Sequence, residues 1–217
     1  KRRVALGRAL LASPPLLLMD EPPTGLDRRN KSEILSYLDV LFKDLHVPVF
    51  YVSHDTDEVA RIAETLVLLE RGKVLGSGPV AEMLARSDLP LIHESDAEAL
   101  LEAVIVGHEQ EHSLTVLEIA GGSLQVPLQP SNPGQHVRVR ITARDVSLTL
   151  SHQSDTSILN ILQGVVLDIL EEGSSQAMVR LNISGAVILS RVTRKSVQSL
   201  GLKPGAKVYA QIKSVAV

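Results

Sequence analysis

Hydrophobic and polar positions alternate in two different ways along this chain. In the first part, apolar residues recur at helical spacing over residues 4–11, 34–45 and 55–64, with Val59, Ile62 and Ala63 expected to face inward. Between them lie two short apolar runs, residues 16–19 and 48–53, typical of strands buried on both faces of a parallel sheet. Residues 66–70 and 73–76 predict a hairpin, and residues 79–86 a short closing helix. Residues 1–86 therefore predict an α/β layer.

The second part of the chain is nearly all strand. The alternation predicts one short helix at residues 194–200 and strands at residues 103–106, 114–119, 124–128, 137–142, 146–150, 164–170, 177–183, 187–192 and 207–213. Many short strands separated by turn residues favour a small barrel over residues 100–217. Residues 87–99, which include a Pro and an acidic run, are expected to be a linker.

An internal repeat lies within the predicted barrel. The pattern Pro-Gly-x-x-Val-x-x-x-Ile occurs at residues 133–141 and again at residues 204–212. Two turn–strand units with this match suggest a duplication.

Composition excludes several classes of function. Net charge is −3, from 22 basic and 25 acidic side chains, which argues against a nucleic-acid partner. The absence of Cys excludes disulfides, thiolate metal sites and cysteine nucleophiles. Every apolar run is far shorter than the roughly 20 residues that cross a bilayer. Because the sequence begins with Lys-Arg-Arg inside an apolar-periodic run, we expect it to be part of a longer protein.

Candidate catalytic groups follow the two predicted parallel strands. Asp20 and Glu21 end the first strand, and His54 ends the second. Ligands bind at the carboxyl ends of such strands. Asp20 could hold Mg²⁺ through a water, Glu21 could face a nucleophilic water, and His54 could reach a γ-phosphate. By itself, the acidic pair could equally be a polar turn after a buried strand.

Four stretches in this region resemble ABC-transporter ATPases in order and spacing. RVALGRAL at residues 3–10 is similar to the helix after the signature loop, and LLMDEP at 17–22 to the Walker B strand. TGLD at 24–27 resembles the D-loop, and SHD at 53–55 the switch-histidine motif. The resemblance implies ATP and Mg²⁺ as cofactors, with Asp20 serving Mg²⁺, Glu21 polarising water, His54 sensing the γ-phosphate and Asp27 at a dimer seam.

The ATPase pattern is incomplete in this sequence. No Gly-x-x-x-x-Gly-Lys-Ser/Thr occurs, and a Gly-rich signature loop would lie before Lys1. That phosphate cradle supplies the N–H donors and the Lys that hold the phosphates. We therefore expect this chain to hydrolyse no ATP by itself.

HEQEH at residues 108–112 matches the zinc-protease pattern His-Glu-x-x-His. That chemistry requires a helix, so that both His side chains share one face. Because the segment joins two predicted strands, a polar hairpin turn is the favoured interpretation.

The barrel carries a second resemblance. TSILN at residues 156–160, SRVTRKSV at 190–197 and YAQIKS at 209–214 look like the OB-like barrel of molybdate-binding, Mop-type or transport-associated domains. The resemblance implies an oxyanion site of hydroxyls and a Lys at a subunit boundary, made by residues Ser157, Thr193, Ser196, Lys213 and Ser214. Leu159 stands where several such domains have a basic residue. The alternative is that Thr193 and Ser196 only cap a helix.

Together, the two resemblances are to the C-terminal part of the ATPase subunit of a molybdate ABC importer. They imply a homodimer that contacts integral-membrane permease subunits and lies in the cytoplasm, peripheral on the inner face of the cell membrane. ABC importers of sugars, polyamines, iron or sulfate also carry such barrels and remain alternatives. A further alternative is an oxyanion-sensing or dimerisation module without catalysis.

Overall fold

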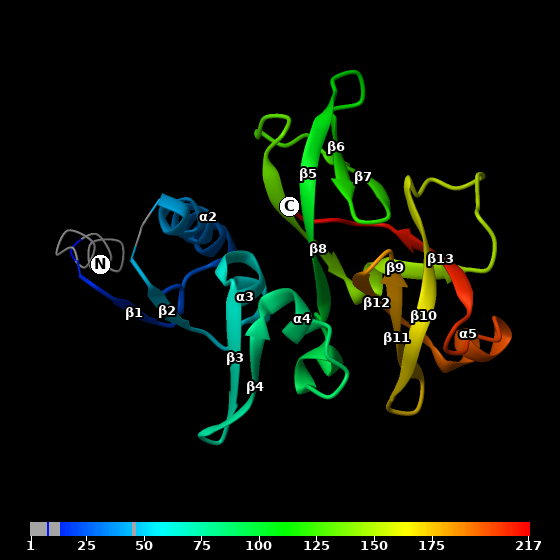
Figure 1. Cartoon of the computed structure of the whole chain (residues 1–217), viewed down its shortest axis with the longest axis horizontal. Helices are drawn as coiled ribbons and strands as arrows, with labels where there is room; N and C mark the ends of the chain where they lie inside the picture. Colours follow the sequence, from blue (N-terminus) through cyan, green and yellow to red (C-terminus); the bar gives the residue numbers. More distant parts are fainter. Residues whose placement is uncertain (1–7, 9–13, 45–46) are drawn as a thin grey trace. The chain divides into compact units, whose positions relative to one another are not determined.

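The computed structural model describes residues 8, 14–44 and 47–217. The chain divides into two compact units, residues 1–66 and residues 67–217 (Figure 1). The helix expected over residues 4–11 lies almost wholly outside the described residues. The division falls earlier than the sequence predicts, since the expected boundary was the segment 87–99.

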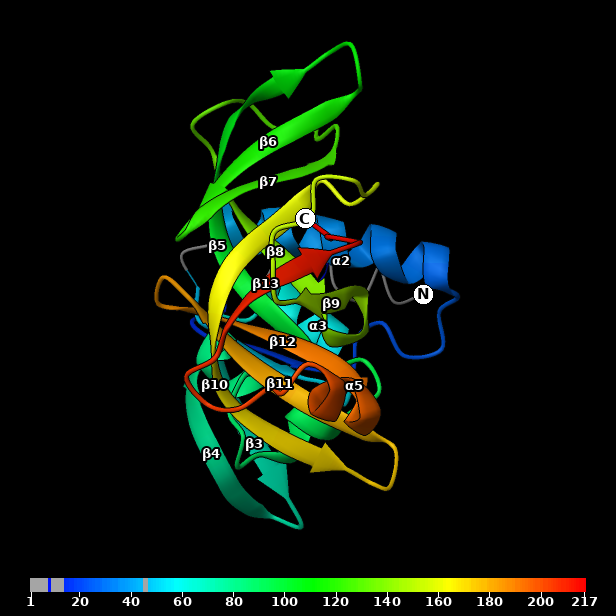
Figure 2. The ribbon, with the colours of Figure 1, turned by 90° about the vertical axis from the view of Figure 1, so that its right-hand side faces the viewer.

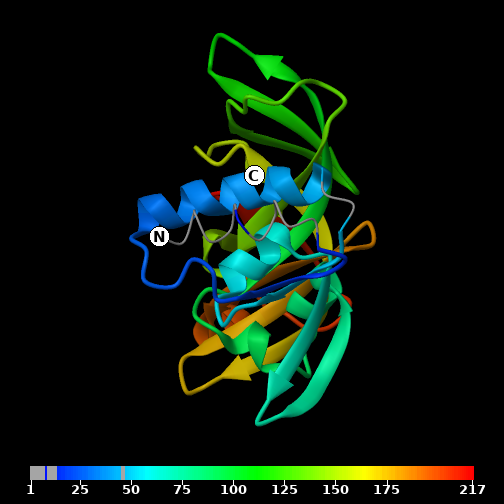
Figure 3. The ribbon, with the colours of Figure 1, turned by 90° about the vertical axis from the view of Figure 1, so that its left-hand side faces the viewer.

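The first unit is built on two parallel strands. Its elements are β1 (Leu17–Asp20), α2 (Arg28–Asp44), β2 (Val49–Val52) and α3 (Thr56–Ile62) (Figure 3). β1 pairs with β2 in parallel, and α2 connects them. Apolar residues at helical spacing in α2, among them Ile34 and Leu38, pack with Leu17 and Met19. Two parallel strands joined by a helix are the part of the predicted α/β layer that the described residues contain.

The face of the two strands that lies opposite α2 is more exposed than the sequence predicted. The sequence predicted burial on both faces, but Leu18 and Phe50, which are register partners, are 72% and 63% exposed. Alternate residues of a strand point to opposite faces, and α2 packs against the face that carries Leu17 and Met19.

The predicted inner face of α3 is wrong. Val59, Ile62 and Ala63 are only partly buried, whereas Glu58 and Ala60 are buried. Apolar periodicity cannot locate this face, because a hydrogen-bonded carboxylate occupies it.

The predicted hairpin, β3 (Thr65–Glu70) and β4 (Lys73–Pro79), spans the boundary between the units and is followed by α4 (Val80–Leu84). The two turn residues, Arg71 and Gly72, have φ of 49° and 77°. Two successive positive φ values define the turn type whose twist matches paired antiparallel strands.

Residues 87–99 are not a linker. They contain η1 (Pro90–His93) and the start of β5, and they bury Ile92, Ala97 and Ala99. These side chains form a core cluster with residues from later in the chain, Ala143 on a short helix and Met178 and Leu189 on strands. The acidic and proline residues that suggested a linker lie between positions that pack into the β structure.

The remaining strands form two antiparallel sheets (Figure 2). The four-stranded sheet has the order β7-β6-β5-β8, with strands β5 (Glu98–Glu109), β6 (Leu114–Ile119), β7 (Gly122–Pro127) and β8 (His136–Thr142). The five-stranded sheet has the order β12-β11-β10-β13-β9, with strands β9 (Val146–Thr149), β10 (Asn160–Glu172), β11 (Gln176–Ile183), β12 (Ala186–Thr193) and β13 (Lys207–Ile212). Two short helices, η2 (Ala143–Asp145) and α5 (Arg194–Ser199), complete this part.

These sheets share one hydrophobic core, and the mostly β character that the sequence predicted for this part is confirmed. Leu117 and Ile141 of the first sheet belong to the same buried cluster as Leu181 and Val208 of the second. All four side chains are fully excluded from solvent. The fold of this unit is therefore mostly β, with two sheets around a common interior.

The internal repeat corresponds to two equivalent turns. Gly134 and Gly205 have φ of 86° and 85°, and each donates its N–H over 2.8 Å to a strand carbonyl, that of Ile105 and Val166 respectively. The halves also exchange strands. β9 pairs with β13, while Ala216 bridges to Arg140 on β8. Each half thus completes the other's sheet.

Candidate functional site

The candidate catalytic residues lie where β1 and β2 end. Asp20 is the register partner of Val52, and the Glu21 N–H donates to the Val52 carbonyl over 2.9 Å. Glu21 adopts φ of 43°, so the chain turns sharply directly after the strand. Because the strands are parallel, Glu21 and His54 emerge at the same edge, as the sequence predicted.

Glu21 and His54 contact each other directly. The His54 ring nitrogen Nδ1 lies 2.6 Å from Glu21 Oε1, and the Thr24 hydroxyl donates to Oε2 over 3.0 Å. The hydrogen bond from Glu21 raises the pKa of His54, and the hydrogen bonds from His54 and Thr24 lower the pKa of Glu21. His54 is 77% exposed and Glu21 38%. The pair can therefore meet a solvent-borne substrate.

Asp20 and Asp27 stand apart from this contact. Asp20 is exposed at the last position of β1. Asp27 accepts from the Asn30 N–H over 3.0 Å and from Asn30 Nδ2 over 2.7 Å, so its carboxylate caps the start of α2. A role of Asp27 at a dimer seam stays a prediction.

Sequence reasoning missed a buried carboxylate beside His54. Glu58 Oε2 accepts from the Tyr51 and Ser53 hydroxyls over 2.8 and 2.7 Å, and Oε1 lies 2.8 Å from Lys31 Nζ. Lys31 also pairs with Asp55. The only available signal was the spacing Asp-x-x-Glu directly after His54, which an ordinary exposed first turn of a helix would also show.

The opposite charges of Lys31 and its two carboxylate partners stabilise one another. Burial would lower the pKa of Lys31, but its hydrogen bonds to Asp55 and Glu58 prevail and raise it. Burial would raise the pKa of Asp55, yet the Lys31 ammonium and the N–H groups of Glu58 and Asp57 hold it below its usual value. Burial and the Glu58 carboxylate raise the pKa of the Tyr51 phenol.

The structure places the candidate oxyanion residues in two groups. Thr193 Oγ1 accepts from the Ser196 N–H over 3.0 Å and so caps α5, and it lies 2.8 Å from Ser196 Oγ. Lys213 and Ser214 are exposed directly after β13, and Ser157 is exposed just before β10. Thr193 and Ser196 are therefore together.

These groups lie at opposite ends of β10 within one chain. Asn160, at the start of β10, is the register partner of Ile212, next to Lys213. Glu172, at its far end, pairs with Gln176, which in turn pairs with Thr193. A strand of 13 residues spans roughly 40 Å. One chain does not gather all five candidates around one anion.

The HEQEH segment has no helical geometry. His108 and Glu109 are the last residues of β5, and a turn leads to β6. The two ring nitrogens of His108 lie 2.9 Å from Thr115 Oγ1 and 3.0 Å from the Ser131 carbonyl oxygen. Over the described residues, no group of three or more His, Asp or Glu is placed to hold a metal.

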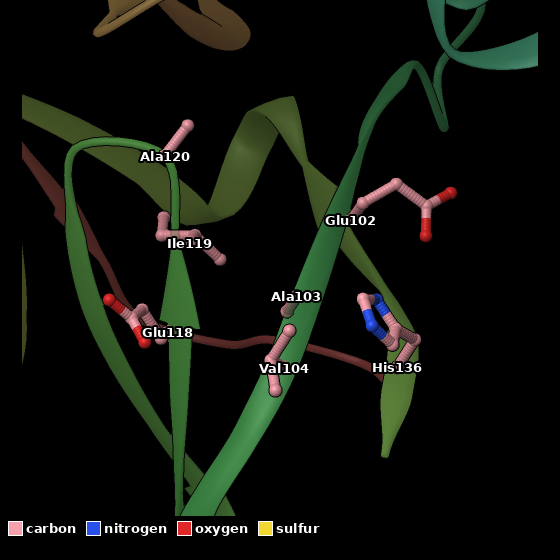
Figure 4. A pocket seen from close by; sticks show the side chains of 7 residues that line it. All are labelled: Glu102, Ala103, Val104, Glu118, Ile119, Ala120 and His136. Carbon is pink, nitrogen blue, oxygen red and sulfur yellow. The ribbon is translucent and has the colours of Figure 1, made fainter. Parts of the chain in front are cut away.

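A shallow hollow of about 360 Å³ lies on the outer face of the four-stranded sheet (Figure 4). Its polar lining comes from Glu102, Glu118 and His136, with Val104 between the last two in the strand register. None of the candidate residues lines it. In the part of the chain that the structure describes, no helix is both long and apolar enough to cross a membrane.

The C-terminal part of the second unit matches a known family. Residues 156–217 match the family model described as the TOBE domain. This match includes all five candidate oxyanion residues.

The whole chain is homologous to molybdenum import ATP-binding proteins. It is 52% identical over 217 residues to ModC of Albidiferax ferrireducens, covering all of this chain and 59% of that protein. It is 50% identical over 218 residues to ModC of Hahella chejuensis and 47% over 220 residues to ModC of Pseudomonas aeruginosa, covering 61% of each. The chain thus spans about three fifths of the length of these curated relatives.

A solved structure of the cytoplasmic molybdate-binding protein ModG, with molybdate bound, also aligns with the chain. The alignment covers 54% of this chain and 94% of the ModG chain, with 28% sequence identity and a TM-score of 0.47.

Proposed function

We propose that this chain is part of an ATP-hydrolysing subunit that energises the import of molybdate. The observation that carries the proposal is the 2.6 Å contact of Glu21 with His54 at the carboxyl ends of two parallel strands. Homology over the whole chain to molybdenum import ATP-binding proteins supports the same assignment.

Each group at this edge has a distinct chemical role in the proposal. Glu21, held by His54 and Thr24, accepts a proton from the attacking water. His54 contacts the γ-phosphate with the ring edge that Glu21 does not occupy. Asp20 is the one carboxylate that would serve Mg²⁺ through a water, which agrees with the few protein ligands that Mg²⁺ uses beside phosphates. Mg²⁺ would neutralise phosphate charge.

The subunit would act as a pair. Two copies would sandwich two ATP molecules, with Asp27 at the seam, and would contact the permease subunits from the cytoplasmic side of the membrane. The phosphate cradle is not in this sequence, so we expect the chain alone to hydrolyse no ATP.

The same proposal assigns the candidate hydroxyls and Lys213 to oxyanion binding. Charge-assisted hydrogen bonds contribute roughly 1.5–3 kcal/mol each, so a dianion needs only a few. Because the two candidate groups lie at opposite ends of β10, we infer that Thr193 and Ser196 of one copy meet Ser157, Lys213 and Ser214 of another.

Complementation of molybdate uptake tests the function. Cells that lack their own subunit should regain uptake with the intact protein and stay deficient with its Glu21→Gln variant. Equal uptake with both proteins would contradict the role of Glu21. Rescue of sulfate uptake without molybdate uptake would move the assignment to another solute.

A further inference from the structure

We propose that Glu58 and Ser53 are positioning residues for His54. This inference rests on the proposed ATPase function for its kinetic consequence, but not for its structural content.

The first step is the position of His54 in its loop. His54 is mostly exposed, and its ring touches the protein through Glu21. An exposed imidazole at the end of a strand has several rotamers and a flexible backbone available to it. A fixed 2.6 Å contact therefore requires that the backbone on both sides of His54 be held.

Ser53 and Asp55 provide that restraint. The Ser53 hydroxyl donates to Glu58 Oε2 over 2.7 Å and accepts from the Asp55 N–H over 3.1 Å, so it spans the His54 peptide units. Asp55 Oδ1 accepts from the N–H groups of Asp57 and Glu58 and caps α3. The residues before and after His54 are thus both tied to the start of one helix.

Glu58 is the centre of this arrangement. Its side chain is only 6% exposed, yet three donors converge on it from three elements: Lys31 on α2, Tyr51 on β2 and Ser53 in the loop. A buried carboxylate is tolerated only when it is paired and hydrogen-bonded. Here every donor lies on a segment next to the candidate site.

Lys31 extends the restraint to the capped start of α2. Its ammonium contacts both Glu58 and Asp55, and its own N–H donates to the Asp27 carbonyl over 2.9 Å. The carboxylate cap of α2, the Glu58 carboxylate and the His54 loop therefore form one connected network. Displacement of Glu58 or Ser53 would therefore move the imidazole relative to Glu21.

The test compares three serine variants by NMR titration of His54 in this chain and by ATP turnover of the intact subunit. Ser53→Ala removes the hydroxyl that spans the loop, and Ser53→Thr keeps it. Ser36→Ala is the matched control, because Ser36 Oγ also links α2 to α3, by accepting from Arg61 over 2.6 Å.

We expect Ser53→Ala to shift the His54 titration midpoint toward the ordinary value and to lower kcat roughly 10- to 100-fold with little change in KM for ATP. Ser53→Thr and Ser36→Ala should keep both close to wild type. Identical His54 titrations in Ser53→Ala and Ser36→Ala would overturn the inference. If the midpoint responds as expected while the wild-type subunit shows no turnover, the positioning role stands and the proposed function fails.

Discussion

At the scale of single residues, the Glu21–His54 contact links pH to stability. His54 has a raised pKa, first because it hydrogen-bonds Glu21 and then because the charges of Glu21, Asp55 and Glu58 favour its protonated form. When folding raises the pKa of a histidine, protonation stabilises the folded state. This contribution is complete at pH values below the pKa of the unfolded chain, about 6.5. That contribution is lost as the pH rises through the folded value.

The contribution of Glu21 to stability depends on pH in the opposite direction. Its lowered pKa gives a stabilising contribution above the ordinary value of about 4.5, which is lost as the pH falls through the folded value. The pair therefore contributes fully between about pH 4.5 and 6.5. Solvent screens it, because both side chains are accessible.

We predict that Glu21→Gln lowers the titration midpoint of His54, because a neutral amide removes the charge that favours imidazolium. The His54 Cε1–H resonance, followed by NMR from pH 4 to 9, measures it. A midpoint unchanged by the substitution would show that the contact is absent in solution.

The candidate residues were predictable to different degrees. Glu21 and His54 were found because acid and imidazole groups at the ends of two apolar strands must share an edge. Glu58 was not, since periodicity treats a glutamate in a helical first turn as solvated. Only the tertiary approach of Lys31, Tyr51 and Ser53 makes its burial favourable.

At the scale of elements, Arg191 on β12 binds residues 87–99, the segment that the sequence predicted to be a linker. Its guanidinium pairs with Glu172 at 2.7 Å and donates to the carbonyls of Ile92, Glu94 and Ser95 at 3.3, 2.7 and 2.8 Å. The Arg191 and Glu172 side chains are 9% and 12% exposed. Arg191 therefore ties this segment to β12.

We predict that Arg191→Ala destabilises the second unit by about 3–5 kcal/mol, because the largely buried Glu172 would lose its guanidinium partner and keep only its contact with His93. Urea unfolding followed by circular dichroism measures the loss. Arg191→Ala combined with Glu172→Gln should recover part of it, since the uncompensated charge is then gone. A loss below about 1 kcal/mol in the single variant, typical of an exposed pair, would contradict the arrangement.

The start of α5 gives a second prediction at this scale. Thr193→Ala removes the hydroxyl that caps the helix and should cost about 1 kcal/mol, whereas Thr193→Ser should retain the cap. Calorimetric titration with molybdate, with sulfate as competitor, then separates capping from binding. Thr193→Ala should lower the free energy of molybdate binding by more than it lowers the free energy of unfolding. No heat with either anion at millimolar concentration would contradict the oxyanion site.

At the scale of the whole molecule, strand exchange makes the two β halves interdependent. The strand positions were predictable from alternation, but the pairing of β9 with β13 was not, because it is set by tertiary contacts between distant segments. The same is true of Ile92 and Ala97, whose burial depends on residues more than 40 positions away. Alternation locates strands and says little about which sheet each one joins.

We predict that residues 156–217 alone show no cooperative unfolding, because β9 and half of the shared core are missing. Residues 88–217 should unfold cooperatively. Residues 100–217 should be less stable, since they lack Ile92, Ala97 and the carbonyls that Arg191 binds. Differential scanning calorimetry compares the three. Equal transitions for 88–217 and 100–217 would show that the preceding segment adds nothing to the fold.

The claim that Glu21 activates water for ATP hydrolysis is tested most directly in the intact subunit. Nucleotide binding and phosphate release should be measured side by side for wild type and Glu21→Gln. We predict that the variant binds ATP as the wild type does and releases phosphate at least 100-fold more slowly, within the range expected for loss of a general base. Phosphate release near the wild-type rate would contradict the assignment of Glu21.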